Sequence, residues 1–317
     1  MMRETVMSKS NLIRVEVVFP VHNRRELTLL CLRSLARIDS ENLDVHVVMV
    51  DDGSTDGTSE AVENEFPGVE IVKGDGNLWF TEGTNAGVRA ALRHNPEYVL
   101  MMNDDQIFDS QFLRFMVETA EKYPRSIVGS LLLLWDTPHK LFQVSPRWET
   151  FSGGWRHWVH QTIWTIPKKP WEVGIIVGNC LLVPAEAIQE CGLMDSKRFP
   201  NFGDAEYTPR MKKNGWRLLI EPRARVFCQP NTIPSKIAKM SLKEKYNALF
   251  VNLKAIQNQR RRFYACLAAA PTRLHGLTAF FALYARVFLK MNPEGDWAQK
   301  QKEKSIAEMF AHAVVKD

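Results

Sequence analysis

The sequence predicts an α/β fold with a mainly parallel sheet flanked by helices, followed by a helical C-terminal extension. Two observations predict the sheet: short β-branched, apolar runs alternate with segments that carry apolar residues at helical spacing, and a polar cluster follows each of the first four runs. This alternation is typical of parallel strands joined by covering helices. A third observation predicts the extension, because the chain is helical in pattern and basic from about Ser235 onward. We therefore expect one domain over residues 1–234 and the extension over residues 235–317.

The expected elements follow one another along the chain. Strands are expected at the apolar runs 15–20, 45–50, 69–73 and 98–103. Helices are expected between them, where apolar residues recur every three or four positions, at 24–38, 58–66 and 81–94. Residues 136–172 hold no clean period. Around them we expect a strand at 126–135, a strand and a helix within 173–188, a helix beginning near Asp204 and a late strand at 217–227.

The composition narrows the class of protein. The 317 residues carry a formal net charge of +5, which suits an anionic substrate or membrane surface and falls short of a nucleic-acid-binding composition. The five cysteines are scattered and form no Cys-x-x-Cys pair, so neither a zinc site nor a disulfide framework is expected. This usage indicates a reducing compartment, the cytoplasm. The N-terminal segment lacks the apolar core of a signal peptide, and no run approaches the ~20 apolar residues of a spanning helix.

The polar clusters after the four expected strands are PVHN (20–23), DDGSTDGT (51–58), GDGN (74–77) and NDDQ (103–106). The carboxyl ends of parallel strands meet at one edge of a sheet, where the ligands of such folds bind. Taken alone, DDGSTDGT suits either a hydrophilic turn or a nucleotide pocket, and it matches neither the dinucleotide nor the P-loop glycine pattern. Asp104 and Asp105 are a second signal, because two adjacent carboxylates resist burial unless a cation holds them.

Five segments, in chain order, resemble family 2 glycosyltransferases of the GT-A fold: VVFPVHNRRELTLLCLRSL, VVMVDDGSTDGT, GNLWFTEGTNAGV, VLMMNDD and FGDAEYTPRMKKNGW. The resemblance covers roughly residues 14–230. It implies a Rossmann-like GT-A sheet and inverting transfer of a sugar from a nucleotide-diphosphate sugar to a glycan or lipid-linked acceptor, commonly with Mg²⁺ or Mn²⁺. Many such relatives build bacterial surface polysaccharides, such as capsule or the O-antigen of lipopolysaccharide, and GNLWFTEGTNAG is most similar to rhamnosyltransferase-type members.

The resemblance also implies a metal and nucleotide site. Asn103, Asp104 and Asp105 occupy the place of the family's Asp-x-Asp element, with Asp105 and Asn103 as the expected metal ligands. A hard cation takes oxygen ligands and leaves other positions to substrate phosphates, so it would relieve the repulsion between the two aspartates. Asn103 departs from the first Asp of the element. The residues expected to border the nucleotide or its diphosphate are Pro20, His22, Asn23, Asp52, Asp75, Asn77, Asn85 and Asp104.

A second acidic element implies the catalytic base. Within FGDAEYTPR, Asp204 corresponds to the family carboxylate that deprotonates the acceptor hydroxyl, and Glu206 is the second acid. Either acid also suits the positive N-terminus of the helix that follows, which is the alternative interpretation. Gly178 and Asn179 fit the family's small-residue stretch near the acceptor. Three tryptophans suit either stacking on sugar rings or ordinary packing: Trp79, Trp155 and Trp158.

The end of the domain and the extension carry two further features. Relatives often place a histidine after the last strand that helps bind metal or diphosphate, whereas this chain has Cys228 and Gln229, neither of which is a good ligand for a hard metal. In the extension, Arg260–Arg262 precede apolar positions at helical spacing. That face suits core packing, a homodimer, or docking at the inner face of the cell membrane, where a lipid-linked acceptor resides.

Two other functions stay open at this point. A nucleotidyltransferase on a similar sheet would need a loop rich in glycine and in Lys or Arg after the first strand, and PVHNRREL contains no glycine. A non-catalytic binding protein would keep the fold and the pocket without turnover. Donor hydrolysis in a simple assay separates both from a glycosyltransferase.

Overall fold

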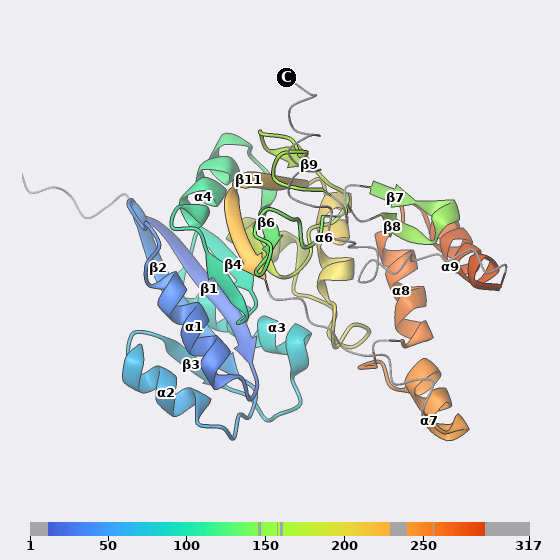
Figure 1. The fold of residues 1–317 in the computed structure, drawn as a ribbon, viewed down its shortest axis with the longest axis horizontal. Coiled ribbons are helices and arrows are strands. Elements are labelled where there is room, and N and C mark those ends of the chain that lie inside the picture. The colour runs from blue at the N-terminus through green and yellow to red at the C-terminus, as the bar shows by residue number, and fades with distance from the viewer. Residues whose placement is uncertain are drawn as a thin grey trace, which may run out of the picture.

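The computed structural model describes residues 12–144, 147–156, 158, 161–228, 240–255 and 257–288. Within them, a nine-stranded sheet runs in the order β3-β2-β1-β4-β10-β6-β11-β5, and β9 pairs with β11. Helices flank this sheet, and further helices follow it near the C-terminus (Figure 1). The predicted fold class is therefore confirmed.

The first half of the chain forms the predicted alternation. Its four strands, all parallel, are β1 (Ile13–Val21), β2 (Leu43–Asp51), β3 (Glu70–Lys73) and β4 (Tyr98–Met102). The helices between them are α1 (Arg25–Leu35), α2 (Thr58–Glu65) and α3 (Trp79–Ala91). The third helix begins two residues before the expected bound and ends in the 3₁₀ turn Leu92–His94.

The second half departs from the parallel pattern. Its main elements are β5 (Gln106–Phe108), α4 (Phe112–Lys122), β6 (Ser126–Leu134), β10 (Cys180–Pro184), α5 (Ala185–Cys191), α6 (Asp204–Lys213) and β11 (Arg217–Cys228). Strand β10 runs antiparallel to both of its neighbours, β4 and β6. The chain leaves the sheet at the carboxyl end of β6 and re-enters at the same edge, so β10 has to run the opposite way. As a result, the residues just before β10 join the edge that carries the polar clusters.

Three short strands lie within the stretch that showed no clean period. They are β7 (Arg147–Glu149), β8 (Gly154–Arg156) and β9 (Trp171–Glu172). Strands β7 and β8 pair as an antiparallel hairpin, in which Trp148 and Trp155 contact each other edge to face with ring centroids 5.3 Å apart. Two or three residues are too few to display a period of two, so the sequence did not predict these strands.

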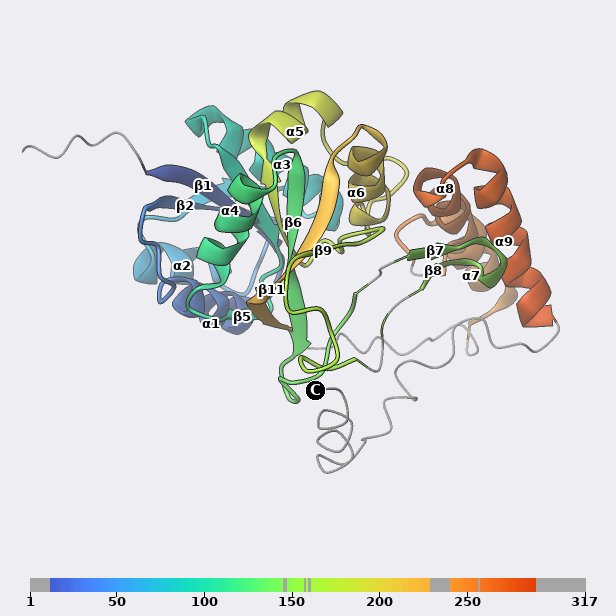
Figure 2. The ribbon, with the colours of Figure 1, turned by 90° about the horizontal axis from the view of Figure 1, so that it is seen from above.

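The sheet is buried on both faces, which explains the continuous apolar runs of its strands. One core cluster contains Val15, Val17 and Phe19 of β1 together with α1, α2 and α4. The other contains Val18 of β1 together with α3, α5 and α6. Figure 2 shows α1 and α5 on opposite sides of the sheet.

The C-terminal helices gather beside α6, away from the sheet (Figures 1 and 2). They are α7 (Leu242–Tyr246), the π-helical turn Asn247–Val251, α8 (Gln259–Ala269) and α9 (Arg273–Phe288). Helix α8 packs on α6, and α9 packs on α8 and on the β7–β8 hairpin. The expected domain boundary after residue 234 lies outside the described residues. None of the described helices is long and apolar enough to cross a membrane.

Candidate active site

A cavity of about 530 Å³ opens at the carboxyl ends of β1, β2 and β4, beside the N-terminus of α3. This volume is typical of a small-molecule site. The lining residues come from all four polar clusters and their neighbours: Pro20, Val21, His22, Arg24, Asp52, Gly76, Trp79, Phe80, Asn103 and Asp104. The structure thus brings together around one cavity five of the residues predicted from the sequence, namely Pro20, His22, Asp52, Asn103 and Asp104.

Hydrogen bonds lock the first two polar clusters together. Nδ1 of His22 lies 2.6 Å from the carbonyl oxygen of Asp52. Asn23 adopts a left-handed backbone (φ 52°), and its side-chain oxygen accepts a hydrogen bond of 2.7 Å from the Thr55 N–H. The Asn23 N–H in turn donates to Ser54 Oγ at 2.9 Å. These hydrogen bonds hold the two loops in one fixed arrangement at the wall of the cavity.

Asp52 organises the third cluster. Its Oδ1 accepts hydrogen bonds from the N–H groups of Gly76 (2.8 Å) and Leu78 (3.2 Å), and its Oδ2 accepts one from Trp79 (2.9 Å). A side chain at Gly74 would lie 2.7 Å from Asp52 Oδ1, so only glycine lets this loop approach the carboxylate. Trp79 has a positive φ of 59°, a strained conformation that these bonds help to hold.

The fourth cluster carries the buried aspartate pair, and Arg24 bridges the two carboxylates. Arg24 Nη1 lies 2.8 Å from Asp104 Oδ1, and Nη2 lies 3.0 Å from Asp105 Oδ2. The carboxylate side chains are only 4% and 3% exposed. Thr28 Oγ1 donates to the other oxygen of Asp104 at 3.2 Å. A guanidinium from 80 residues earlier in the chain is therefore the cation that allows this burial.

The aspartate pair and Asn103 offer oxygen ligands that fit a hard divalent cation. Burial raises the pKa of Asp104 to about 6, with Arg24 opposing that rise and Asp105 adding to it. Asn103 and Asp104 line the cavity, and carboxylate and amide oxygens are the ligands that Mg²⁺ and Mn²⁺ accept. Among the residues that the structure describes, no group of three or more His, Cys, Asp and Glu side chains is arranged for a metal. Such a cation would take its remaining ligands from water and a diphosphate.

The loop before β10 brings Gly178 and Asn179 to the same edge as Asp204, the first residue of α6. The Gly178 N–H donates to Asp204 Oδ2 at 2.9 Å. A Cβ at Gly178 would lie 3.0 Å from the Asp204 Cβ and 3.1 Å from Cζ of Phe80, which lines the cavity. The Asn179 carbonyl accepts the Asn103 N–H at 3.0 Å. Burial raises the pKa of Asp204, and the Gly178 N–H acts against that rise.

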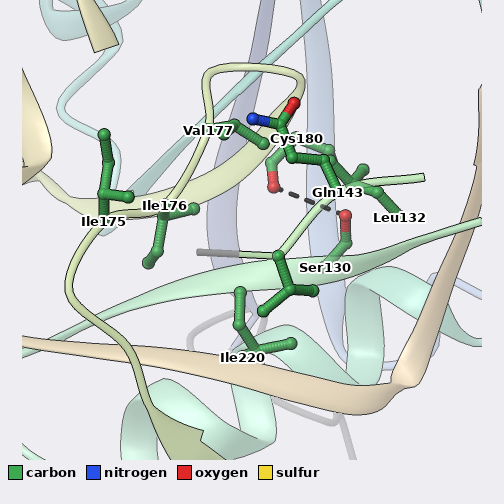
Figure 3. Close-up of a pocket in the computed structure, with 9 residues that line it drawn as sticks. Ser130, Leu132, Gln143, Ile175, Ile176, Val177, Cys180 and Ile220 are labelled. Carbon is green, nitrogen blue, oxygen red and sulfur yellow. Dashed lines mark hydrogen bonds between the residues drawn. The ribbon is translucent and has the colours of Figure 1, made fainter. Parts of the chain in front are cut away.

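An apolar anchor fixes this loop. Figure 3 shows its residues over a small cavity of about 10 Å³ bounded by β6, β10 and β11. Such a cavity has room for about one water molecule at most and is therefore no ligand site. The Ile176 N–H donates to Thr208 Oγ1 of α6 at 3.1 Å. A Cβ at Gly129 would lie 2.6 Å from Ile176 Cγ2, so the glycine within β6 makes room for this side chain.

Glu206 lies in a different environment from Asp204. It is buried, and Arg210 engages both of its oxygens, with Nε 2.8 Å from Oε2 and Nη2 2.9 Å from Oε1. The Asp195 N–H also donates to Oε1 at 3.0 Å. Arg210 Nη2 donates to the Leu193 carbonyl at 2.7 Å. Glu206 therefore ties α6 to the loop after α5.

Four predicted nucleotide residues do not line the cavity: Asn23, which joins the two loops described above, and Asp75, Asn77 and Asn85. Asp75 and Asn77 are exposed, and the Asn77 N–H donates to Asp75 Oδ1 at 2.9 Å in the loop whose Gly76 does line it. Asn85 is buried, where its amide exchanges hydrogen bonds of 2.9 and 3.1 Å with the backbone of Met194. Asn85 joins α3 to the loop before α6.

Trp79 is the tryptophan that lines the cavity, and the C-terminal extension reaches it. Lys254 Nζ lies 4.5 Å from the centroid of the Trp79 ring. The Lys254 carbonyl accepts a hydrogen bond of 3.1 Å from Asn201 Nδ2, just before α6. The extension therefore contributes to the rim of the cavity.

The other two tryptophans lie in packed surroundings. A Cβ at Gly174 would lie 2.3 Å from the Trp155 ring, so glycine makes room for that ring. Trp158 stacks on Trp171 with ring centroids 6.1 Å apart.

Cys228 ends β11 in the sheet interior, where Gln106 Nε2 lies 3.7 Å from its Sγ. Burial raises the pKa of this thiol well above its ordinary value. Gln229 lies outside the described residues.

Sequence reasoning did not single out four residues of the cavity: Val21 and Gly76, which lie within the quoted polar clusters, and Arg24 and Phe80, which lie outside them. Arg24 directly follows PVHN, and the demand of Asp104 and Asp105 for a cation was the signal that pointed to such a partner. Phe80 gave no signal, because its role depends on contact with Gly178, 98 positions later in the chain.

Comparisons with known proteins agree with this geometry. The model of glycosyl transferase family 2 matches residues 16–191, more than half of the 317 residues. N-acetylglucosaminyl-diphospho-decaprenol L-rhamnosyltransferase of Mycobacterium tuberculosis, from strains CDC 1551 / Oshkosh and ATCC 25618 / H37Rv, is 26% identical over 205 residues, which are 57% of this chain and 66% of that protein. The chain therefore spans slightly less than two thirds of the length of these curated relatives.

Solved structures share the fold. GalNAc-T7 with UDP, GalNAc and Mn²⁺ superimposes with a TM-score of 0.58 at 15% identity, over 90% of this chain and 59% of that one. S. aureus TarS 1-349 superimposes with a TM-score of 0.55 at 14% identity, over 95% of this chain and 79% of that one. The likeness to these structures extends the predicted GT-A fold over most of the chain. With the family match, it follows that the chain belongs to glycosyltransferase family 2.

Proposed function

We propose that this protein transfers a sugar from a nucleotide-diphosphate sugar to a hydroxyl of a lipid-linked or glycan acceptor, with inversion at the anomeric carbon. One observation carries the proposal. The cavity lined by His22, Asp52 and Asp104, with Asp105 joined to Asp104 behind it through Arg24, adjoins the carboxylate of Asp204 through Phe80 and Gly178. A donor site and a base on separate elements are what a displacement at the anomeric carbon requires.

The cavity suits the donor. Pro20 and His22 line the wall proposed for the nucleobase and ribose, and Asn23 and Asp52 hold its loops in place. At the other wall, Asp105 with Asp104 or Asn103 would hold Mg²⁺ or Mn²⁺. When bound, such an ion supplies positive charge against the charge that develops on the leaving diphosphate.

Asp204 is proposed as the base. Its carboxylate takes the proton of the acceptor hydroxyl while that oxygen bonds to the anomeric carbon and the bond to the diphosphate oxygen breaks. Burial raises the pKa of Asp204 and so brings that pKa closer to the operating pH. A positioned base contributes ~10²–10⁴-fold to rate. Glu206 is less suited to this role, because Arg210 and the Asp195 N–H already satisfy its oxygens.

The proposed acceptor is lipid-linked, in the assembly of a bacterial surface polysaccharide. The similar Mycobacterium tuberculosis protein is named as an L-rhamnosyltransferase whose acceptor is an N-acetylglucosaminyl-diphospho-decaprenol. Helix α7 and the turn after it expose Leu242 (86%), Tyr246 (62%) and Phe250 (45%), with Lys243 and Lys245 beside them. We define these five residues as the α7 patch and propose that it contacts the anionic inner face of the membrane.

The test is a panel of nucleotide sugars, assayed for thermal stabilisation and turnover with Mg²⁺, with Mn²⁺ and with chelator. A donor raises the unfolding midpoint by mass action, and transfer to a polyprenyl-diphosphate sugar releases the nucleoside diphosphate. A nucleotidyltransferase would instead consume a nucleoside triphosphate and a sugar phosphate. A binding protein would show stabilisation without turnover, and either result contradicts the proposal.

A further inference from the structure

We propose that Arg24 is the counter-cation of the Asp104–Asp105 pair when no metal is bound. When a divalent cation binds the two carboxylates, Arg24 leaves them and binds the diphosphate. The inference rests on the proposed function, because the diphosphate of the donor is the second ligand of Arg24. It makes Arg24 both a competitor of the metal and a partner of the nucleotide.

The geometry is that of a bridge between two charges. Each terminal nitrogen of Arg24 takes a different carboxylate, at 2.8 Å for Asp104 and 3.0 Å for Asp105. Both acids are almost completely buried, whereas the Arg24 side chain is 32% exposed. One guanidinium is thus shared between two carboxyl groups, which are also ligands that a divalent cation favours.

The metal and Arg24 need the same two carboxylates. A hard divalent cation binds carboxylate oxygens, and Arg24 N–H groups already occupy one oxygen of each acid. Arg24 cannot share in ligation, since a guanidinium has donors and no acceptor. Binding of the metal without diphosphate therefore has to compete with hydrogen bonds between charged groups.

The displaced guanidinium of Arg24 can bind the diphosphate of the donor. Arg24 lines the same cavity as Asn103 and Asp104, and its side chain is 32% exposed. A guanidinium offers two parallel N–H donors that match phosphate oxygens. Diphosphate therefore removes the competitor, and the metal and the diphosphate should bind more tightly together than apart. Linkage makes this effect reciprocal.

The experiment measures Mn²⁺ alone, and pyrophosphate at saturating Mn²⁺, by calorimetry on the full chain and on Arg24→Met. The matched control is Arg25→Met, since Arg25 is the adjacent arginine and is paired with exposed Glu26 at 3.0 Å. Arg24→Met should bind Mn²⁺ alone ~10-fold more tightly than the parent, a typical coupling factor, and pyrophosphate more weakly. Arg25→Met should match the parent in both titrations.

Thermal unfolding keeps the test decisive if Arg24→Met is unstable. Its midpoint should be lowered without metal and raised by Mn²⁺ by more than the midpoint of the parent. Arg24→Lys keeps the positive charge and loses the paired N–H donors of the guanidinium. Its Mn²⁺ affinity should lie between those of the parent and Arg24→Met.

Three results overturn the inference: equal or weaker Mn²⁺ binding by Arg24→Met, no Mn²⁺ binding by either protein, or a lowered midpoint that Mn²⁺ does not raise. If the competition is found and no nucleotide sugar turns over, the proposed function fails and the role of Arg24 stands.

Discussion

Replacing Gly178 with alanine tests whether the contact between its loop and Asp204 sets the geometry of the site. An ideal Cβ at position 178 lies 3.0 Å from the Asp204 Cβ, 3.2 Å from its Cγ and 3.1 Å from the Phe80 Cζ. Favourable carbon contacts lie at ~3.5–4.0 Å, so about 0.5 Å of movement has to be shared among these groups. The loop itself is anchored at Ile176, and we therefore expect the Asp204 carboxylate and the Phe80 ring to shift.

The size of the effect follows from that shift. Overpacking costs about 1–3 kcal/mol of folding free energy. A misplacement of about 1 Å costs ~10²-fold in rate, so half of it should lower kcat by ~10-fold, or about 1.4 kcal/mol. The shift also lengthens the 2.9 Å hydrogen bond from the Gly178 N–H, which favours the ionised carboxylate. The pKa of Asp204 should rise, and the acid limb of kcat/KM should move to higher pH.

The assay is the transfer rate over a pH series, with thermal unfolding measured in parallel. Gly68→Ala is the control, because nothing lies within 4 Å of a Cβ added there. It should leave rate, pH profile and stability unchanged. If Gly178→Ala keeps the parental kcat and an unshifted acid limb while its unfolding midpoint falls, Gly178 only packs, and the reasoning is refuted.

Three further predictions follow from other parts of the site. Asp204→Asn should raise the unfolding midpoint at pH 7, because a carboxyl whose pKa is raised in the folded protein loses stability as the pH rises from the ordinary pKa of about 3.9 through the raised pKa. Calorimetry from pH 3 to 8 should find that this gain vanishes at low pH. Equal midpoints of parent and variant at every pH would contradict the prediction. Asp52→Ala leaves the N–H groups of Gly76 and Trp79 without their acceptor and should cost about 1–3 kcal/mol in urea unfolding, together with weaker nucleotide binding; unchanged values would show that the loop holds without it. The double variant Leu242→Asp, Phe250→Asp should reduce cosedimentation with anionic vesicles, which in the parent should fall with added salt; a parent that does not bind, or binds regardless of salt, argues against the α7 patch.

The fold was largely predictable where the signal is local. Strands β1, β2 and β4 are apolar runs that are largely buried, and β3 is a partly buried strand at the edge of the sheet. The boundaries of all four differ from the predicted ones by no more than two residues. The direction of β10 was not predictable, because it depends on the edge at which residues 135–179 return the chain to the sheet. A run of five apolar residues reads the same in either direction.

The sequence predicted many of the residues that lie at the site, but it did not predict which residues they contact. The need of Asp104 and Asp105 for a cation is a local consequence of their adjacency, whereas the identity of that cation is set by Arg24, far away in sequence. Asn85 and Glu206 show the same limit. Their polar groups are taken by Met194, Asp195 and Arg210, partners that no spacing rule indicates.

The most direct test of the central claim compares Asp204→Asn with Glu206→Gln in a transfer assay, alongside calorimetry of donor binding. The account predicts that Asp204→Asn lowers kcat by ~10²–10⁴-fold with donor affinity nearly unchanged, because the base acts on the acceptor hydroxyl. Glu206→Gln should have the milder effect on rate, and unlike Asp204→Asn it should lower stability, because it breaks the ion pair with Arg210. An Asp204→Asn variant that transfers sugar at nearly the parental rate, giving product of the same anomeric configuration, would contradict the account.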